Sequence, residues 1–478
     1  MIWCVAMRTT DDELTWAEQE FGAARLGNRA RTARAVLMAA RAAAGPAGTV
    51  SSVFRVPAER EGAFRLLESD QVSTDELQRS ARWAAARRCR GSSFVYAPVD
   101  QTSLNLTDRT RSKGFGAVGR GRDSALGLQV MTSLCVTPDG TPQGLGAQLY
   151  WSRPRRKKKR PQERDAQRVE EKETERWREV MRRTREGLAV EAPGTRPWFQ
   201  LDRGGDAWPI LDELATDAGV ELTIRASWDR RLVGEPGSGP RYLWATVERL
   251  EPVGDFLFHV PATGKRTERL ALIEVRSTQV TLDLRDKRTG KRHPLTMWAV
   301  LAQEQGSVPK GERAIEWMLL TTHAAPTIIE AYEVIFGYSM RWRIECFHQT
   351  WKSGACDVES TQLRSVRAVV RWATFLASVA MRIQRLIHLS RTQPEQPATV
   401  EFTQPEIDAV IAARKPKGLR PGEVPPIVDV VRWIADEGGY TGKSSGGPPG
   451  AKVLARGLDR LEVLFRLFNH RHRRENET

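Results

Sequence analysis

Four polar side chains are grouped on one short segment of the chain. Residues 338–352 read Tyr-Ser-Met-Arg-Trp-Arg-Ile-Glu-Cys-Phe-His-Gln-Thr-Trp-Lys. If this segment forms one helix, with about 100° per residue, then Tyr338, Arg341, Glu345 and Lys352 fall within roughly 60° of one another around its axis. A carboxylate flanked by an arginine, a lysine and a tyrosine suits a metal ion that lies beside a phosphodiester.

The same segment carries an apolar stripe next to the polar group. Ile344, Phe347 and Trp351 occupy adjoining positions of the predicted helix. We therefore expect a helix that buries one face in a core and presents its Tyr, Arg, Glu and Lys side chains on the next face.

Two aspartates elsewhere in the chain are candidates to complete such a site. Asp100 and Asp202 each follow a short apolar run typical of a strand, and each begins a polar turn. Because ligands gather at the carboxyl ends of strands in α/β sheets, these two carboxylates and Glu345 would form an all-oxygen site for two divalent cations. For either aspartate alone, an ordinary turn or capping residue is the alternative.

The hydrophobic pattern predicts a helical N-terminal region followed by a mixed sheet. Residues 12–80 read as helical, with helices over 31–44 and 58–67. From residue 93 we expect one sheet covered by helices, one at about 165–187 and another that begins near 207 and is capped by Asp206. The strands of this sheet are predicted at 94–99, 126–136, 145–151, 198–202 and 220–226.

A second β pattern follows and then gives way to helices. Residues 229–320 read as a β-rich insertion or continuation of the sheet, with strands at 243–250, 270–275, 280–284, 295–303 and 315–321. After Pro326 the chain is predicted to be helical to its end, with linkers near 391–400, 415–426 and 438–450.

The charge balance favours a polyanionic partner. The 478 residues include 74 Lys and Arg against 59 Asp and Glu, a formal charge of +15, and such a surplus is typical of nucleic-acid binding. A GC-rich genome, which raises the content of Arg and Ala, is the alternative explanation. The five cysteines are scattered without zinc-ligand spacing, so any metal should be a hard cation held by carboxylates.

The sequence shows no signal for a membrane. No apolar run approaches the ~20 residues that a bilayer span needs, and the N-terminal apolar stretch is too short for a signal peptide. We therefore expect a cytoplasmic protein with no membrane partner.

The N-terminal helices carry an arginine-rich face. Arg31, Arg34 and Arg65 lie there without matching acidic runs, and a small helical module of this kind suits DNA docking. A solvated helix face is the plainer alternative.

Taken together, these motifs resemble the bacterial insertion-sequence transposases of the DDE class, in the group that contains the transposon Tn-five enzyme. The spacing Tyr338-x(2)-Arg341-x(3)-Glu345-x(6)-Lys352 matches the signature of that group. The resemblance runs nearly end to end. Further similar segments, two of them around the family's catalytic aspartates and two in its end-binding domain, are 99–104, 201–206, 26–34 and 61–65.

The resemblance implies an α/β fold with an RNase H-like catalytic core. A helical end-binding domain would occupy residues 1–88, the catalytic domain residues 89–390 with a β-rich insertion at about 229–320, and a helical dimerisation domain residues 391–478. The protein would be associated with the nucleoid and would form a homodimer in a synaptic complex.

The resemblance also implies a cut-and-paste reaction on double-stranded DNA. Asp100, Asp202 and Glu345 would bind two Mg²⁺ ions, with Mn²⁺ as a substitute. The enzyme would nick the terminal inverted repeat with water, and the freed 3′-hydroxyl would form a hairpin that is then opened. The same hydroxyl would finally attack target DNA.

The basic and aromatic residues around this site gain roles by the same resemblance. Tyr338 and Arg341 would hold the phosphate of a base rotated out of the duplex, and Lys352 would contact DNA beside the metals. Trp317 stands where the family places the aromatic on which that base stacks. Ordinary burial in a strand is the alternative for Trp317.

The resemblance suggests two further DNA contacts, and the sequence departs from the family pattern at two places. Arg225 and His348 are weaker candidates for DNA contacts at the site. Gln349 stands where the family pattern has a basic residue, and the loop 153–160 is richer in basic charge than the corresponding family segment.

Two other functions stay open at this point. One is a domesticated DNA-binding regulator without transposition activity, against which the intact acidic residues argue. The other is a non-transposing nuclease with an RNase H-like fold.

Overall fold

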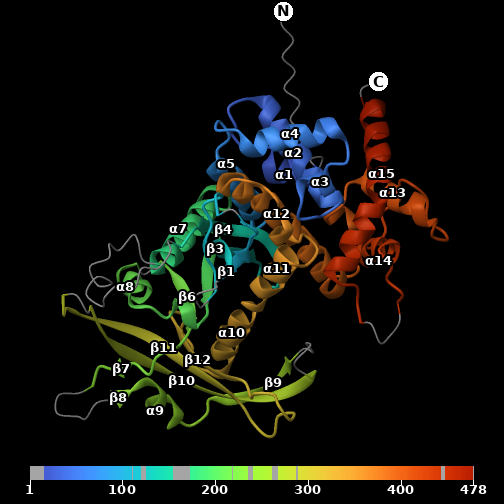
Figure 1. The fold of residues 1–478 in the computed structure, drawn as a ribbon. Coiled ribbons are helices and arrows are strands. Elements are labelled where there is room, and N and C mark those ends of the chain that lie inside the picture. The colour runs from blue at the N-terminus through green and yellow to red at the C-terminus, as the bar shows by residue number, and fades with distance from the viewer. Residues whose placement is uncertain are drawn as a thin grey trace, which may run out of the picture.

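Three groups of elements surround one long sheet (Figure 1). The computed structural model describes residues 15–109, 111–119, 125–153, 173–217, 219–234, 241–260, 267–286, 289–442 and 447–476. The N-terminal helices lie above the sheet, the C-terminal helices lie beside them, and a β lobe extends from the far end of the sheet. Most of the basic loop predicted at 153–160 falls outside the described residues.

The N-terminal region is a bundle of short helices, as predicted. Capping side chains mark its helix starts, for example Asn28, whose Oδ1 accepts a hydrogen bond from the Arg31 amide at 2.9 Å. The helices predicted over 31–44 and 58–67 are confirmed as α2 and α4. The bundle consists of α1 (Trp16–Phe21), α2 (Arg29–Ala44), α3 (Val50–Val53), α4 (Pro57–Glu68) and α5 (Thr74–Arg87).

The described strands form one twelve-stranded mixed sheet. Its main path runs in the order β2 (Gly116–Ala117), β3 (Leu126–Val136), β1 (Phe94–Asn105), β5 (Arg196–Leu201), β6 (Glu221–Arg225), β12 (Glu316–Thr321), β11 (Arg292–Glu304), β10 (Arg269–Arg285), β7 (Arg231–Leu232) and β8 (Arg241–Tyr242). Off this path, β4 (Pro142–Trp151) pairs with β3, and β9 (Gly254–Val260) pairs with β10. The pairing is antiparallel from β4 through β3 to β1, parallel from β1 through β5 to β6, and antiparallel again from β6 to β12.

Helices cover both faces of this sheet and create two cores. Because successive residues of a strand point to opposite faces, Trp198 and Phe199 of β5 enter different hydrophobic clusters. The cluster with Phe199 also contains side chains of α7 (Thr174–Glu191) and α8 (Trp208–Thr216). The cluster with Trp198 contains side chains of α10 (Ile328–Ser339), α11 (Trp342–Lys352) and α12 (Val366–Thr392).

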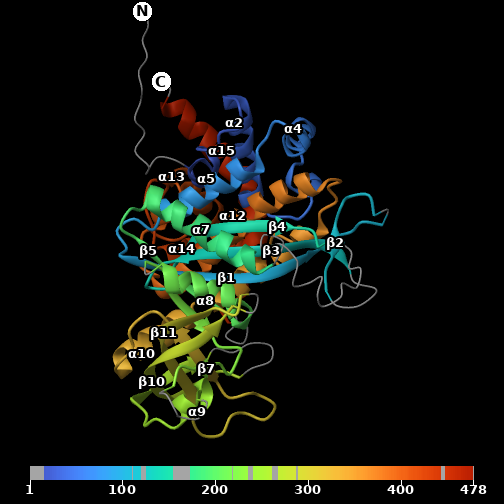
Figure 2. The same cartoon turned by 90° about the vertical axis from the view of Figure 1, so that its left-hand side faces the viewer.

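The β lobe corrects two sequence predictions. The predicted strand at 243–250 is wrong, because Leu243 and Val247, four residues apart, are both buried on one side of helix α9 (Leu243–Glu248). The predicted strands at 270–275 and 280–284 are one continuous strand, β10. Since β12 pairs directly with β6, the lobe continues the central sheet (Figure 2).

The C-terminal helices return to the N-terminal bundle. They are α13 (Gln404–Arg414), α14 (Ile427–Glu437) and α15 (Ala451–Asn476), and α15 lies beside α2 in both views (Figures 1 and 2). Arg55 and Asp459 form an ion pair at 2.6 Å, and Arg41 Nη1 lies 3.7 Å from Glu462 Oε1. The two ends of the chain therefore pack against each other.

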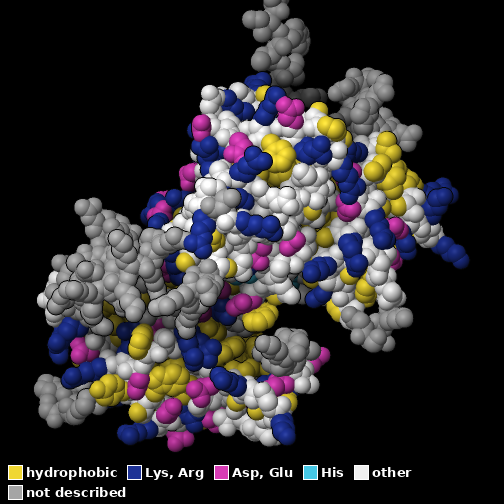
Figure 3. Space-filling view, in the orientation of Figure 1, with side chains coloured by type: hydrophobic (Ala, Val, Ile, Leu, Met, Phe, Trp, Pro, Cys, Tyr) yellow, Lys and Arg dark blue, Asp and Glu magenta, His cyan; other side chains and the backbone are white. Residues whose placement is uncertain are grey.

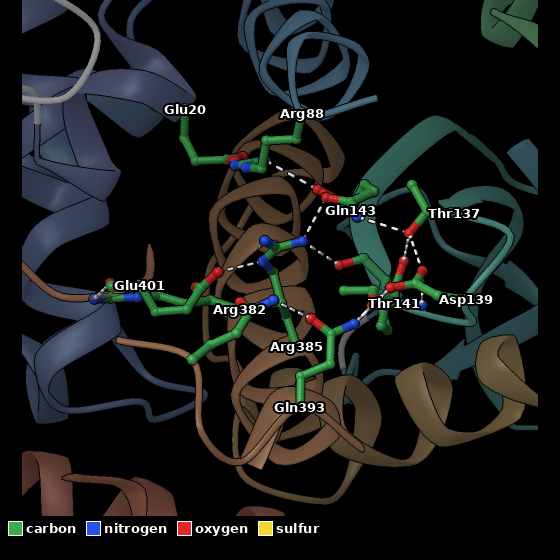
Figure 4. A network of polar contacts seen from close by, with 12 residues as sticks. Glu20, Arg88, Thr137, Asp139, Thr141, Gln143, Arg382, Arg385, Gln393 and Glu401 are labelled. Atoms are coloured by element: carbon green, nitrogen blue, oxygen red, sulfur yellow. Dashed lines mark hydrogen bonds and ion pairs between the residues drawn. The ribbon is translucent and has the colours of Figure 1, made fainter. Parts of the chain in front are cut away.

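A polar network joins the N-terminal helices, the sheet and α12 (Figure 4). Arg88 pairs with the buried Glu20 and donates to the Gln143 carbonyl at 3.0 Å. Arg385 of α12 donates to the Gln143 side chain and pairs with Glu401. Burial raises the pKa of Glu20, and the charge of Arg88 opposes that shift.

No described helix is both long and apolar enough to cross a bilayer.

Arg371 of α12 ties the N-terminal bundle to the core. Its side chain is 1% exposed, and its guanidinium donates to the carbonyls of Leu67 at 2.7 Å and Ser69 at 2.8 Å, and to that of Val72. Burial lowers its pKa to about 10. These bonds satisfy the end of α4 and the turn that leads into α5.

We predict that Arg371→Leu lowers the free energy of unfolding by about 3 kcal/mol, because it leaves buried carbonyls without donors. Thermal melting measured by circular dichroism tests this. Arg367→Leu, one turn earlier on the exposed side of α12, is the control and should shift the melting temperature far less. Equal shifts for the two variants would contradict the role given to Arg371.

Candidate active site

The strands deliver the predicted site residues to one face of the sheet. Val99, Leu201 and Ile224 lie in the core on the α7 side. Each next residue, Asp100, Asp202 and Arg225 respectively, therefore belongs to the opposite side, which α10 and α11 cover. Strand alternation thus assigns both aspartates to the side that carries residues 338–352.

The register of β1 and β5 makes the two aspartates neighbours. Val99 of β1 pairs with Leu201 of β5 in parallel register, and Asp100 and Asp202 are the next residues along the chain. β5 ends at Leu201, as predicted. The prediction that a strand ends before Asp100 is wrong, because β1 continues to Asn105 and Asp100 pairs with Thr132 of β3. Adjacent strands lie about 4.8 Å apart. The Asp202 carboxylate also accepts a hydrogen bond from the Gly204 amide at 2.8 Å, which fixes the turn that follows β5.

The segment 338–352 is two helices and not one. α10 ends at Ser339 and α11 begins at Trp342. At the joint the Arg341 amide donates to the Tyr338 carbonyl at 3.0 Å, which is the tighter i−3 pattern of a 3₁₀ turn. The prediction of a single helix is wrong at this point, yet both residues of the joint keep right-handed helical dihedrals.

Both faces predicted for this segment are present. Ile344, Phe347 and Trp351 are fully buried. On the polar side, Arg341 Nη1 lies 3.2 Å from Glu345 Oε1. The apolar stripe therefore fixes the rotation of α11, and this rotation directs Glu345 towards the strand ends.

The charges of this cluster act on one another. Burial, and next the negative charge of Asp202, raise the pKa of Asp100 to about 7, with Arg341 opposing and Glu345 adding to the shift. Burial acts to lower the pKa of Arg341, but Tyr338 and the three carboxylates outweigh it and raise this pKa. The structure thus brings Asp100, Asp202 and Glu345 into one electrostatic unit around Arg341.

Tyr338 lies between this unit and two further candidates. Its ring contacts the Trp317 ring with centroids 5.1 Å apart in an edge-on arrangement. Burial raises the pKa of Tyr338, and the charges of Arg341 and Arg225 oppose the shift. Arg225 also donates to the carbonyl of Glu316 at 2.8 Å, next to Trp317. Trp317, Tyr338, Arg225 and Arg341 therefore form one continuous cluster.

Lys352 points to β1 beyond Asp100. Its Nζ lies 3.2 Å from Thr102 Oγ1 and 3.7 Å from Glu359 Oε1. Glu359 accepts a hydrogen bond from the Asn105 amide at 2.9 Å. Sequence reasoning missed Glu359, because nothing in its local pattern shows that the chain after α11 returns to β1.

His348 is a buried neutral imidazole beside Asp100. Its Nδ1 lies 3.8 Å from Asp100 Oδ2. Burial lowers its pKa to about 3, with a further contribution from Lys352, so this contact is not an ion pair at neutral pH. Its Nε2 has no hydrogen-bond partner in the described part of the chain.

Asp206 does not cap α8, contrary to the sequence prediction. The N-cap of α8 is Ala207, which makes no side-chain cap. The buried Asp206 carboxylate instead accepts hydrogen bonds from the amides of Ser227 at 2.6 Å and Trp228 at 3.2 Å, and it pairs with Arg230. It therefore ties the end of β5 to the chain that follows β6.

The carboxylates fit a hard divalent cation in donor chemistry. All three offer oxygen, the ligand that Mg²⁺ and Mn²⁺ prefer. Burial, and next the negative charges of Asp202 and Glu345, raise the pKa of Asp100. Among the described residues, no three acidic, imidazole or thiol groups are already placed to hold a metal ion. Glu345 is paired with Arg341, so it would have to turn from Arg341 to join the two aspartates.

The predicted N-terminal arginines lie apart from this cluster, on α2 and α4. Arg31 Nη1 donates to the Leu26 carbonyl at 3.2 Å. Arg34 lies against α4 at Gly62. Arg65 is exposed and pairs with Glu61. Only Arg65 therefore presents most of its side chain to solvent.

Two family models match the two ends of the chain. The model described as "Transposase DNA-binding" matches residues 13–72, which hold α1 to α4. The model described as "Transposase Tn5 dimerisation domain" matches residues 378–476, from within α12 to the end of α15. The chain belongs to the Tn5-like transposases. It is a DNA transposase that has a DNA-binding domain and a dimerisation domain.

The dimerisation domain of this Tn5-like transposase carries both basic and apolar surface. Lys and Arg side chains gather over α13 and α14, and apolar surface lies over α15 (Figure 3). Val463 and Leu467 of α15 are 59% and 60% exposed. Exposed apolar residues on one helix are typical of an interaction surface.

The raised pKa of Asp100 predicts how stability depends on pH. The folded protein keeps a proton on Asp100 up to about pH 7, whereas the ordinary pKa of the group is 3.8. Folding therefore takes up a proton between these values, and this group makes stability fall as pH rises through that window. Asp100→Asn should remove this effect.

We expect Asp100→Asn to be more stable than the wild type at pH 8 without divalent cations, by about 2–4 kcal/mol, and equally stable near pH 4. Urea unfolding at pH 4, 6 and 8 measures this. Asp255→Asn, at an exposed position of β9, is the control and should show no such pH-dependent gain. A constant difference across the pH range would contradict the coupling.

Proposed function

We propose that this transposase is a DDE enzyme that cuts and pastes its element with Asp100, Asp202 and Glu345 as the catalytic set. The observation that carries the proposal is the parallel register of β1 and β5, because both aspartates directly follow the last parallel pair, Val99 and Leu201. The reaction would comprise a nick at the transposon end, hairpin formation and opening, and strand transfer into target DNA.

The strand order supports an RNase H-like core. β4, β3 and β1 form an antiparallel run, and β5 and β6 join β1 in parallel. Asp100 in the middle of β1 and Asp202 directly after β5 then lie where the parallel pairing of these strands stops, which is the edge at which α/β sheets bind ligands. Glu345 comes from the helix packed over them.

The carboxylates would hold two Mg²⁺ ions, with Mn²⁺ as a substitute. Such ions would supply activation of the attacking oxygen and charge stabilisation at the scissile phosphate. The chain's own residues do the positioning. Arg341 offsets part of the negative charge of the cluster by pairing with Glu345, and Glu359 lies 3.7 Å from the Lys352 Nζ beside β1.

The neighbouring cluster would grip the DNA strand at the cleavage point. Arg341 and Tyr338 offer a charge and a hydroxyl for a phosphate, and Arg225 adds a second guanidinium. Trp317 is half-buried beside Tyr338 and would stack on an extruded base. The N-terminal bundle with Arg31, Arg34 and Arg65 would bind the terminal inverted repeat, and dimerisation would pair two ends.

Cleavage of DNA that carries the inverted repeats flanking the gene tests the catalytic set. With Mg²⁺, the wild type should give nicked and hairpin products, and Asp100→Asn, Asp202→Asn and Glu345→Gln should each lower the rate by at least about 10³-fold, since each removes a ligand of the reacting centre. Asp255→Asn controls for loss of a carboxylate and should cleave normally.

Undiminished cleavage by Asp100→Asn would contradict the proposal. If the protein nicked DNA but did not transfer strands from a pre-cleaved end, it would be a nuclease and not a transposase.

The role of Trp317 predicts a defect confined to one step. Trp317→Leu keeps an apolar side chain in β12 but removes the stacking surface, which is worth about 1–3 kcal/mol per base. Hairpin formation should slow by roughly tenfold to a hundredfold, while the first nick keeps its rate. Time-resolved denaturing gels separate the two products.

Trp298→Leu serves as the matched control, because Trp298 is a half-buried tryptophan of the neighbouring strand β11 on the same side of the sheet. It should slow neither step. Equal slowing of the nick and the hairpin by Trp317→Leu would assign Trp317 to ordinary packing.

A further inference from the structure

A group of basic side chains lies on the side of α11 away from the carboxylates. Arg343 precedes Glu345 by two residues, which places it about 200° around the helix. A methyl group built on Gly140, in the turn between β3 and β4, would lie 3.4 Å from Arg343 Nη2 and 3.7 Å from His388 Cε1. Arg343 and His388 therefore face the same small space, and Arg391 follows one turn later on α12.

Arg343 is not neutralised by any residue in the described part of the chain. Its guanidinium makes no hydrogen bond or ion pair with any described residue, although burial lowers its pKa. Asp139 is the carboxylate that acts on it, and both oxygens of Asp139 are already engaged (Figure 4). They accept from the Thr137 hydroxyl at 2.6 Å, from the Thr141 hydroxyl at 2.8 Å and from Gln393 at 2.5 Å.

His388 supplies a second, independent sign of a missing ligand. Its side chain is 4% exposed, and its Nε2 has no hydrogen-bond partner in the described part of the chain. Burial, and next the charge of Arg343, lower its pKa to about 4. A neutral imidazole can still donate one hydrogen bond to an anion.

The other members of the group do not offset its charge. Burial raises the pKa of the nearby Cys346, so its thiol is uncharged at neutral pH. Arg391 donates to the Pro449 carbonyl at 3.1 Å, which leaves further N–H groups of its guanidinium for a ligand. Burying a guanidinium without a counter-ion is costly, so the site is prepared for an anion.

We propose that Arg343, His388 and Arg391 form a binding site for a backbone phosphate of DNA, separate from the carboxylate cluster. Two guanidiniums and an imidazole match the oxygens of a phosphate. The width of one helix, about 10 Å, separates this site from the carboxylates, so a duplex that reaches them also comes near Arg343. The inference rests on DNA as the partner of this transposase and not on the catalytic set.

The salt dependence of DNA binding by the full chain tests the site. Each phosphate contact contributes about one unit to the slope of log K against log[salt]. Arg391→Gln and Arg343→Gln should each reduce the slope by about 1 and weaken binding roughly fivefold at 0.15 M salt. Fluorescence anisotropy with a labelled duplex measures both quantities.

Two matched variants control the experiment. Arg432→Gln on α14 removes an exposed arginine that pairs with Asp429, and it should leave the slope unchanged. Arg391→Lys keeps the charge and should restore most of the slope. A wild-type slope in both Arg343→Gln and Arg391→Gln would overturn the proposal.

Titration with inorganic phosphate, followed by the NMR signals of the His388 imidazole, separates the sources of the anion. A shift of these signals that is lost in Arg391→Gln, together with the reduced slope, supports the site. If phosphate shifts the His388 signals but the variants keep the wild-type salt slope, the site binds a free anion and not DNA, and the proposal is overturned. If the variants alter dimerisation but keep the wild-type salt slope, the site binds a carboxylate of a second copy, and the proposal is overturned as well.

The test is independent of catalysis. If Arg343→Gln and Arg391→Gln kept the wild-type salt slope, the cleavage experiments would be unaffected. Conversely, normal cleavage by Asp100→Asn would remove the proposed catalytic set and leave the phosphate site intact.

Discussion

The burial of Asp100 beside a second carboxylate, Asp202, is the constraint on which the site depends. Parallel register places Asp100 and Asp202 side by side, and α10 and α11 pack over the same side of the sheet. Burial and the charge of Asp202 raise the pKa of Asp100 to about 7. Such an arrangement costs free energy in the absence of a counter-ion, so its retention in the fold is itself an argument for a cation-dependent role.

The surrounding elements hold this arrangement in place. The buried stripe of α11 fixes where Glu345 and Arg341 point, and Trp351 anchors the end of that helix by donating to the Ala373 carbonyl of α12 at 3.0 Å. α12 in turn holds the N-terminal bundle through Arg371 and the sheet through Arg385. The DNA-binding domain, the carboxylates and the dimerisation domain therefore share one helix as a common support.

The sequence predicted the parts of this structure that depend on local pattern. The strand end before Asp202, the buried stripe Ile344, Phe347 and Trp351, and the N-terminal helices all follow from periodicity and capping signals. The strand end predicted before Asp100 does not exist, because the polar residues after it still pair with β3. The break between α10 and α11 did not follow, because the segment 338–352 itself contains neither glycine nor proline. The β reading of 243–250 failed because a short apolar run has no decisive period.

Contacts between distant segments were also beyond prediction. The partners of Asp206 are residues 227–230, and Glu359 meets Lys352 only because the chain returns to β1. The proposed phosphate site of Arg343, His388 and Arg391 brings together α11, α12 and the turn between β3 and β4. Sequence spacing alone does not bring such groups together, since they meet through tertiary packing.

Counting bound Mn²⁺ tests the central claim most directly, because the claim is that three carboxylates act as one cation site. Electron paramagnetic resonance of free Mn²⁺ at pH 8 gives the number of ions bound by the protein without DNA and in the presence of its end DNA. We predict that the wild type binds Mn²⁺ at this site, up to two ions with DNA, and that Asp100→Asn, Asp202→Asn and Glu345→Gln each lose this binding. Equal binding by the wild type and all three variants would contradict the account.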